Sequence, residues 1–304
     1  MDILDTLLSF AQLSGSINVQ CHFQQEWYVE HQAEQAQGIV HIVTHGSSYL
    51  KFDNNEKARI INKGDIIFFP RTIKHILSNQ ADCNNNQSTI TSSNNGAFIL
   101  KKSGFNHSPD LTLFCAKFSY DRRSDLFNNL PDIIILNLNN SILQPILSIL
   151  QQEAKTPQYG ATTIVNSLSG VLLILLIRTY LEQEKATLSG MLNGLRDKRL
   201  YKVMNKIIQY PEQNWHITQL TEIANISRAQ LIRLFNQQIG FSPYAFVNHI
   251  RLQKAAKLLR SSQENILTIA LNCGFQSETN FGKAFKKYFG VTASEYRKNK
   301  TSHI

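Results

Sequence analysis

The residues best suited to chemistry in the first half of the chain are Cys21, Cys115, His41 and His75. A thiol near an imidazole or a cation has a lowered pKa, and its thiolate is the form that peroxides and hypohalous acids attack. His22 follows Cys21 directly, so Cys21 is a candidate for a redox-active thiol. In the alternative interpretation, both cysteines are small apolar residues of a β core, as free cysteines often are.

A second set of reactive side chains lies on the outer faces of two predicted helices in the last third of the chain. An outward arginine such as Arg233 can hydrogen-bond to a guanine edge, and apolar side chains can contact thymine methyl groups. Basic residues such as Lys286 suit the phosphate backbone. The predicted DNA contacts are Arg228, Ala229, Gln230, Ile232 and Arg233 on the first helix, and Glu278, Thr279, Asn280, Lys283 and Lys286 on the second.

The charge distribution supports this interpretation. Residues 196–304 hold 17 Lys or Arg against 6 Asp or Glu, whereas residues 1–195 hold 14 against 16. The basic surplus of the chain therefore belongs to its C-terminal part, as expected of a domain that binds a polyanion. The alternative is a solvated basic face without a nucleic-acid partner.

A helix-turn-helix at residues 266–288 would hold the second reading helix. Phe281, Phe285 and Tyr288 recur at helical spacing and predict a buried stripe. Gly274 can adopt a positive φ in the turn, and Ser277 can cap the helix that follows. A short helix, a glycine turn and a capped helix with a basic outer face are typical of this motif.

The same pattern recurs at residues 217–238, so the two units form an internal repeat. There Asn225 takes the place of the turn glycine, because asparagine tolerates the left-handed region. The buried stripe of this copy is Leu231, Leu234, Phe235 and Gln238. The segment 243–260 between the units begins with proline and predicts a rigid connecting helix.

The rest of the chain alternates short strands with turns and then becomes helical. After a helix predicted at 2–12, residues 16–120 carry many short apolar runs broken by Gly, Pro and Asn, which favours a small barrel or double-sheet jelly roll. The predicted fold class is α+β. The expected domains are a sensor at 1–140, a helical hairpin at 141–185, a linker at 186–197 and an all-α DNA-binding domain at 198–300.

Residues 196–300 closely resemble the DNA-binding domain of the AraC family of transcription regulators. The matching phrases are LFNQQIGFSPYAFV, RLQKAAKLLR, IALNCGF and KAFKKYFGVTASEYR. Two departures are Ala293, where the family usually has proline, and Thr221, where it usually has alanine. The resemblance implies a transcription activator and not an enzyme, and its expected partners are promoter DNA and RNA polymerase.

The β region resembles a cupin domain, which many AraC-type regulators carry as a sensor. The phrase NKGDIIFFP at 62–70, followed by His75, resembles the second cupin motif, and residues 38–52 resemble the first. Metal-binding cupins combine three histidines with a carboxylate. Here His41 and His45 can share one face of a strand, but the carboxylate is missing, so we expect neither a metal nor another cofactor.

The whole chain is similar to cupin-type AraC regulators that respond to reactive chlorine species. The similarity rests on MDILDTLL, Cys21, KGDIIFFP with His75, Cys115 in LFCAKF, and the C-terminal domain. It implies that Cys21 is oxidised and that Cys115 resolves it as a disulfide, while His41 and His75 hold the oxidant or tune the thiol. In relatives of this architecture a helix pair mediates dimerisation, so we expect a homodimer. The alternative is a purely intramolecular core helix.

Two further interpretations of the sensor stay open at the level of sequence. The barrel can bind a small organic ligand in a pocket lined by aromatic residues such as Trp27 and Tyr28, or it can be a cupin enzyme fused to a DNA-binding domain. The acidic opening MDILDTLLSFAQ lacks the features of a signal peptide, and the apolar run 164–177 is too short and polar for a membrane span. We therefore expect a cytoplasmic protein without a membrane partner, whose cysteines are reduced by default.

Overall fold

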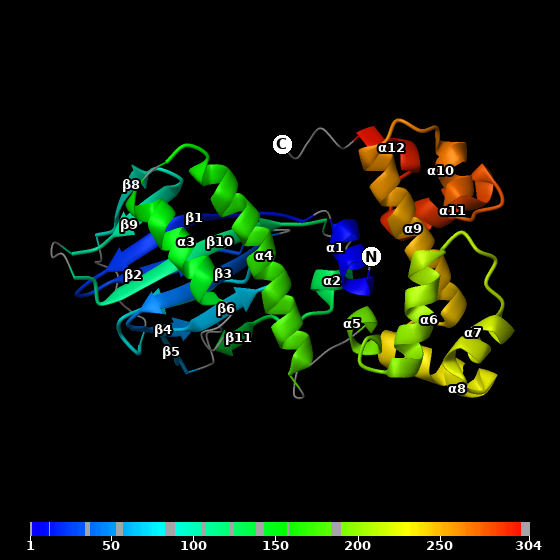
Figure 1. The fold of residues 1–304 in the computed structure, drawn as a ribbon, viewed down its shortest axis with the longest axis horizontal. Helices are drawn as coiled ribbons and strands as arrows, with labels where there is room; N and C mark the ends of the chain where they lie inside the picture. The colour runs from blue at the N-terminus through cyan, green and yellow to red at the C-terminus, as the bar shows by residue number, and fades with distance from the viewer. Residues whose placement is uncertain are drawn as a thin grey trace. The chain divides into compact units, whose positions relative to one another are not determined.

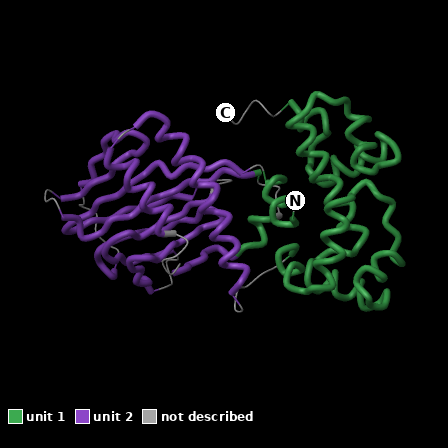
Figure 2. Tube along the Cα trace, in the orientation of Figure 1, with its two compact units in different colours: residues 1–12, 121–130, 187–304 green, residues 13–120, 131–186 purple. Residues whose placement is uncertain are grey.

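The computed structural model describes residues 2–11, 13–33, 37–52, 57–82, 89–104, 108–121, 125–137, 143–156, 158–183 and 190–298. The boundaries expected at 140–141 and 185–186 lie outside these ranges, as do residues 299–300 of the predicted DNA-binding domain. The chain divides into two compact units (Figure 2). One comprises residues 13–120 and 131–186, and the other comprises residues 1–12, 121–130 and 187–304.

Two β-sheets form most of the unit at 13–120 and 131–186 (Figure 1). The larger sheet has the order β11-β6-β3-β10-β1-β9-β8, and the smaller has the order β2-β7-β4-β5. Their pairs are antiparallel except β1 with β9. The strands of the larger sheet are β1 (Ser14–Phe23), β3 (Gln37–His45), β6 (Asp65–Phe69), β8 (Thr91–Asn95), β9 (Phe98–Lys102), β10 (Leu111–Ser119) and β11 (Ile134–Asn137); those of the smaller are β2 (Tyr28–His31), β4 (Ser47–Lys51), β5 (Arg59–Asn62) and β7 (His75–Ser78).

Strand β10 shows why the strands of this unit carry apolar residues on both faces. Leu111, Leu113 and Cys115 belong to one hydrophobic cluster with side chains of the smaller sheet, such as Leu50 and Leu77. The alternate residues of β10, among them Phe114 and Phe118, are also buried. A central strand covered on both faces loses the polar alternation of a half-solvated one. The cupin-like, double-sheet expectation is therefore confirmed.

A helical hairpin covers the outer face of the larger sheet near β1 (Figure 1). It consists of α3 (Leu143–Lys155) and α4 (Ala161–Glu182), and α4 packs against β1. Gly15 of β1 allows this approach, because a Cβ there would lie 2.4 Å from Phe118 and 3.1 Å from Ser169 of α4. With 22 residues, α4 is long and apolar enough to cross a membrane by length and composition. Its residues Val165, Leu172 and Leu176 are buried against the unit, as in a core helix.

Helices build the unit that comprises residues 1–12, 121–130 and 187–304. They are α1 (Ile3–Ala11), α2 (Asp125–Asn128), α5 (Gly190–Gly194), α6 (Lys198–Gln209), α7 (Ile217–Ala224), α8 (Arg228–Leu234), the π-helical turn η1 (Phe235–Ile239), α9 (Pro243–Ser261), α10 (Ile266–Asn272), α11 (Glu278–Phe289) and α12 (Ala293–Lys298). The long α9 packs against α6, α10, α11 and α12 and so joins the two halves of the unit.

The division of the chain differs from the one expected from sequence in two places. Helix α1 packs on α6 and α9, and α2 packs on α5, so both belong to the helical unit although they fall within the expected sensor at 1–140. Helix α5 lies inside the expected linker at 186–197, with Met191 and Leu192 buried. The small residues around it suggested a flexible chain, but these two apolar side chains give it a packed face.

Candidate nucleic-acid interface and sensor site

The first predicted reading helix, α8, exposes the side chains that the sequence assigns to DNA. Ser227 caps the helix, because its hydroxyl accepts a hydrogen bond from the Gln230 N–H at 3.3 Å. Leu231 and Leu234 are buried and fix the rotation of the helix about its axis. The opposite side presents Arg228, Ala229 and Arg233 to solvent, with Gln230 and Ile232 half-buried.

The turn before α8 uses asparagine where the repeat elsewhere uses glycine. Asn225 has φ +54°, in the left-handed region, and ends α7. At the other end of α7, the Gln219 side chain accepts from the His216 N–H at 3.0 Å. The unusual Thr221 points its hydroxyl back along the helix and donates to the Thr218 carbonyl at 2.7 Å. The hydroxyl that distinguishes Thr221 from the usual alanine therefore has a hydrogen-bond partner within its own helix.

The end of the first reading helix differs from the predicted stripe. The chain passes from α8 into the π-helical turn η1, which Gly240 ends with φ +84°. The wider turn brings Ile239 into the core, while Gln238 is half-buried and donates to Asp197 at 3.4 Å. The sequence placed Gln238 in the buried stripe because an unbroken α-helical period was assumed.

The second reading helix, α11, repeats the arrangement of the first. Ser277 caps it by accepting from the Asn280 N–H at 3.2 Å. Phe281, Phe285 and Phe289 are buried beneath it. Its outer side exposes Glu278, Thr279, Asn280, Lys283 and Lys286.

Two local features fix the ends of the second helix-turn-helix. Gly274 has φ +88°, and a Cβ on it would lie 2.7 Å from the Glu212 Cα, so glycine is required there. At α12, Ala293 replaces the usual proline. The helix start is held instead by Thr292 and Glu295, since the Glu295 carboxylate accepts from the Thr292 N–H at 2.8 Å and the Thr292 hydroxyl accepts from the Glu295 N–H at 3.2 Å.

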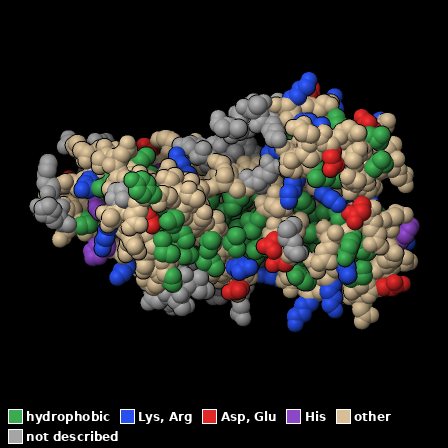
Figure 3. All heavy atoms as spheres, turned by 45° about the horizontal axis from the view of Figure 1, so that its top comes forward, with side chains coloured by type: hydrophobic (Ala, Val, Ile, Leu, Met, Phe, Trp, Pro, Cys, Tyr) green, Lys and Arg blue, Asp and Glu red, His purple; other side chains and the backbone are tan. Residues whose placement is uncertain are grey.

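The helical unit therefore presents two capped helices joined by α9, which begins at the Ser242 cap and runs for 19 residues, about 28 Å of rise. Both basic and acidic side chains are visible on this unit (Figure 3), but residues 196–304 hold 17 Lys or Arg against 6 Asp or Glu. Two helix-turn-helix units on a basic domain suit reading of the major groove, with phosphate contacts around each helix.

In the sheet unit, the structure brings together all four residues predicted for sensing. Cys115 on β10 and His41 on β3 are direct strand partners, and the Cys115 Sγ lies 3.2 Å from His41 Nδ1. Cys21 on β1, the strand that pairs with β10, also hydrogen-bonds with Cys115. His75 reaches across from β7 of the smaller sheet, with its Nε2 2.8 Å from His41 Nε2.

The hydrogen bonds of this cluster fix the proton positions. His75 Nδ1 lies 2.8 Å from the Ile73 carbonyl oxygen, which can only accept, so Nδ1 carries the proton and Nε2 of neutral His75 is an acceptor. His41 must then donate from Nε2, which leaves its Nδ1 as an acceptor. The Cys115 thiol therefore donates to His41 Nδ1.

Burial sets the charge state of these groups. Burial lowers the pKa of His41 well below its ordinary value and the pKa of His75 to about 4. The hydrogen bond with Cys21 and burial raise the pKa of the Cys115 thiol. The structure therefore pairs a neutral thiol with a neutral imidazole at Cys115. This differs from the expected pairing of Cys21 with His22, whose side chain lies on the opposite face of β1 because strand residues alternate.

A fifth residue, His31, joins the cluster and was missed in the sequence. His31 of β2 pairs directly with His75 of β7, and their rings stack with centroids 4.6 Å apart. Burial and the neighbouring His75 lower the pKa of His31 to about 3. The signal was its place at the end of the short run YVEH, opposite the strand that begins at His75.

His45 does not join the cluster. The register of β3 against β10 shifts between Val43 and His45, and this irregularity leaves His45 exposed instead of beside His41. The argument from sequence therefore weighed the wrong pair of histidines. One ligand atom from each of His31, His41 and His75 lies within 4.8 Å of the others, and no carboxylate belongs to this cluster within the described part of the chain.

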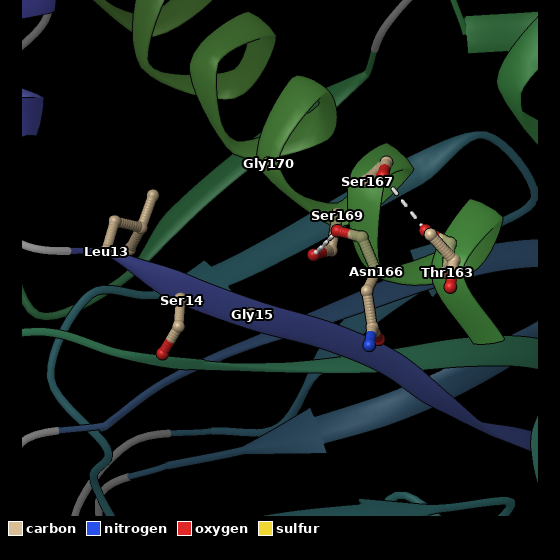
Figure 4. Close-up of a pocket in the computed structure, with 8 residues that line it drawn as sticks. All are labelled: Leu13, Ser14, Gly15, Thr163, Asn166, Ser167, Ser169 and Gly170. Carbon is tan, nitrogen blue, oxygen red and sulfur yellow. Dashed lines mark hydrogen bonds between the residues drawn. The ribbon is translucent and has the colours of Figure 1, made fainter.

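Trp27 and Tyr28 were expected to line a small-ligand pocket, but the structure places Trp27 in the core. Trp27 is buried in the core and stacks on Phe23 with ring centroids 4.9 Å apart, so it fills the interior. Tyr28 is half-buried on β2. An open pocket lies elsewhere, between the start of β1 and α4, and is lined mainly by small polar side chains (Figure 4). Its residues Ser167 and Ser169 already donate hydrogen bonds to helix carbonyl groups.

Comparisons with known proteins agree with this two-part architecture. A family model described as Cupin matches residues 2–182, which is more than half of the chain, and one described as Helix-turn-helix domain matches residues 220–299. The chain is 48% identical over 300 residues to the HTH-type transcriptional regulator MtrA of Neisseria gonorrhoeae, covering 98% of each protein.

Two further relatives match along the same length. An uncharacterized HTH-type transcriptional regulator of Haemophilus influenzae is 39% identical over 302 residues, covering 98% of this chain and 99% of that protein. The RCS-specific HTH-type transcriptional activator RclR of Escherichia coli (strain K12) is 26% identical over 304 residues, covering 98% of this chain and 97% of that protein. With its paired helix-turn-helix units and its double-sheet domain, the chain belongs to the AraC family of DNA-binding transcription regulators that carry an N-terminal cupin domain.

Proposed function

We propose that this regulator is a cytoplasmic transcription activator that senses reactive chlorine or related oxidants through Cys21. The observation that carries the proposal is the hydrogen-bonded series Cys21, Cys115 and His41, which lies buried between two sheets. The name of the E. coli relative, an RCS-specific activator, supports the same signal. The small-ligand alternative gains no support from Trp27, because that side chain is packed in the core.

The proposed chemistry balances with one equivalent of hypochlorous acid. Cys21 gives up two electrons and becomes a sulfenic acid, while the oxidant leaves as chloride and a proton. The Cys115 sulfur then attacks the Cys21 sulfur, water leaves, and a disulfide forms. His41 Nδ1 is placed to accept the proton that Cys115 loses, since it already accepts the hydrogen bond from that thiol.

The strand register suits this bridge after a local adjustment. Cys21 pairs with Leu113 and Cys115 pairs with Val19, so the two cysteines are diagonal neighbours on adjacent strands. Diagonal Cα atoms lie about 7 to 8 Å apart, whereas a disulfide prefers about 5.5 to 6 Å. Closing the bridge must therefore pull β1 and β10 together, and this displacement is the signal that we propose.

The exposed apolar side of the hairpin supports a homodimer. Three apolar residues of the hairpin are each about two fifths exposed or more: Ile149 of α3, and Ile164 and Val171 of α4. Hydrophobic side chains are visible on the exposed face of this unit (Figure 3). A self-complementary apolar face is typical of a two-fold interface. A dimer bound to promoter DNA would then place two such regulators where RNA polymerase binds.

The test is a reporter under an operator that the purified full chain selects from random-sequence DNA. Hypochlorite should induce the wild type and a control in which Cys83, a cysteine that the proposed mechanism does not use, is replaced by serine. Cys21→Ser should lose induction, and Cys115→Ser should retain only part of it. Equal induction in all four proteins would refute the thiol mechanism. Operator binding is measured in parallel. If the reduced wild type does not bind the selected operator, that result does not count against the thiol mechanism.

A further inference from the structure

Two lysines lie beside the cysteines on the inner face of the larger sheet, which is the face turned towards the smaller sheet. Lys101 of β9 is the direct strand partner of Cys21 on β1. Direct partners on neighbouring strands share one face of a sheet, and their strands lie about 4.8 Å apart. Lys117 follows Cys115 by two residues on β10, without a bulge between them, so these two side chains also share a face.

The residues beyond Cys21 in the row that starts at Lys101 are apolar. Leu113 of β10 pairs with Cys21, Val43 of β3 pairs with Leu113, and both are fully buried. Lys101 itself is half-buried, and it forms no ion pair with another residue that the structure describes. Partial removal of an ammonium group from water is unfavourable without a counter-charge. An anion bound at Lys101 would supply that counter-charge.

The charges of both lysines act on the sensor site. A thiol hydrogen bond and burial raise the pKa of Cys115, and Lys101 and Lys117 both oppose this rise. Burial lowers the pKa of His31 to about 3, and the same two lysines contribute to that lowering. Cys115 and His31 belong to different sheets, so the two ammonium groups lie close enough to influence both sides of the site.

We infer that Lys101 and Lys117 form a binding site for a small monovalent anion next to Cys21. A cleft lined by charges of one sign raises the local concentration of ions of the other sign. Hypochlorite is the anion that fits the proposed function, and this choice of ligand rests on that function. The site itself does not rest on it, because both lysines hold these positions in the reduced protein.

Solvent reaches this part of the inner face from the side of β8. Ser92 and Asn94 of β8 pair with Lys101 and Ile99 of β9, so they share the inner face, and both are exposed. Ile99 is 38% exposed although it is apolar. Lys117 is exposed as well. A small anion can therefore approach the lysines without first crossing the packed core.

Oxidation of Cys21 by hypochlorite conserves one negative charge, which suits a fixed cationic site. The sulfur takes the oxygen atom and gives up two electrons, the thiol becomes a sulfenic acid that keeps the proton, and the chlorine leaves as chloride. Lys101 thus faces an anion before, during and after the transfer. A charge that is already in place needs no reorganisation at the moment of reaction.

The test compares two alkylating reagents of nearly equal size, anionic iodoacetate and neutral iodoacetamide, on the reduced full-length protein without oxidant. Mass spectrometry gives the rate of each reagent at Cys21. Both reagents attack the same thiolate, so the ratio of the two rates reports charge selectivity and is independent of the thiolate fraction.

Lys101→Met should lower the ratio of the iodoacetate rate to the iodoacetamide rate by about 5-fold or more, and Lys117→Met should lower it as well. Lys101→Arg keeps the charge and should keep the ratio. The matched control is Lys102→Met, which should behave as the wild type does. Lys102 pairs with His22 and therefore lies on the opposite face of the sheet.

Each outcome decides the inference. Equal ratios in Lys101→Met and Lys102→Met would overturn it, as would an unchanged ratio in Lys117→Met. Absence of alkylation at Cys21 in the wild type would also overturn it, because no small anion could then reach the thiol. Circular dichroism of every variant confirms its folding. Because oxidant is absent, the anion site can fail while hypochlorite still induces the reporter, and the reporter can fail while the charge selectivity is present.

Discussion

Arg233 and Lys286 carry the same charge on exposed faces of the two reading helices, yet they should contribute differently to DNA binding. Arg233 lies in the last turn of α8, and its planar guanidinium can make two hydrogen bonds to one guanine. Lys286 lies in the last turn of α11, and its ammonium group acts as a compact charge that suits a phosphate. Affinity and sequence choice are thus assigned to different residues.

Replacing Arg233 by alanine should cost about 1 to 3 kcal/mol of binding free energy and relax specificity in one half of the operator. The reason is the loss of hydrogen bonds to a base edge. Binding to a library of single-base operator variants, measured for both proteins, checks this. A uniform loss across all variants would instead assign Arg233 to the phosphate backbone.

Replacing Lys286 by alanine should weaken binding to every operator variant by a similar factor. One fewer phosphate contact should also reduce the slope of log affinity against log salt by about 1. Titrations at several salt concentrations measure this slope. An unchanged slope together with altered sequence preference would show that Lys286 reads bases.

Among the elements, the turn of the second helix-turn-helix shows a strict local requirement. Gly274 and Gly290 both have positive φ, at +88° and +75°, but only Gly274 is crowded. The Glu212 backbone lies against it, whereas no atom lies within 4 Å of a Cβ placed on Gly290. The two glycines therefore separate backbone strain from steric overlap.

Gly290→Ala should lower the free energy of unfolding by about 1 to 2 kcal/mol, the cost of a left-handed alanine. Gly274→Ala should lower it by more, because the added Cβ also displaces the Glu212 backbone. Urea unfolding of both variants, followed by circular dichroism, gives the comparison. Equal losses would mean that the backbone at Glu212 moves aside freely.

How far the sequence predicts these elements depends on whether the contacts are local. Caps such as Ser227 and Ser277, and the left-handed Asn225, follow from the residue itself and its neighbours, so the two helix-turn-helix units were predicted closely. The place of His31 depends on pairing with a strand more than forty residues away, and the exposure of His45 depends on an irregular register. Neither feature can be derived from the spacing of neighbouring residues, so the sensor site was only partly predicted.

At the scale of the whole molecule, the chain passes from the sheet unit to the helical unit directly after β10, the strand that carries Cys115. Tyr120 belongs to the sheet unit and Asp121 to the helical unit. The Asp121 carboxylate forms an ion pair with Arg260 of α9 at 2.9 Å and accepts a hydrogen bond from the Tyr296 hydroxyl of α12 at 2.6 Å. Arg260 also lies over the Tyr296 ring, 4.5 Å from its centroid. The chain therefore leaves β10 at a residue that side chains of α9 and α12 hold in place.

Asp121→Asn should lower the free energy of unfolding by about 1.5 to 3 kcal/mol, because it removes a charge-assisted contact whose carboxylate is mostly buried. The matched control Asp132→Asn, in an exposed pair with Arg71, should change it by less than about 1 kcal/mol. Thermal or urea unfolding measures both. If the two variants lose the same free energy, the Asp121 contact does not anchor the segment that follows β10.

The most direct measurement of the whole account is the affinity of the purified protein for its selected operator before and after one equivalent of hypochlorite, and again after reduction with dithiothreitol. Fluorescence anisotropy of labelled DNA gives the affinity, and mass spectrometry counts the thiols. We predict a several-fold change for the wild type that accompanies loss of two thiols, reverses on reduction, and is absent in Cys21→Ser. The same reversible change in Cys21→Ser would contradict the account.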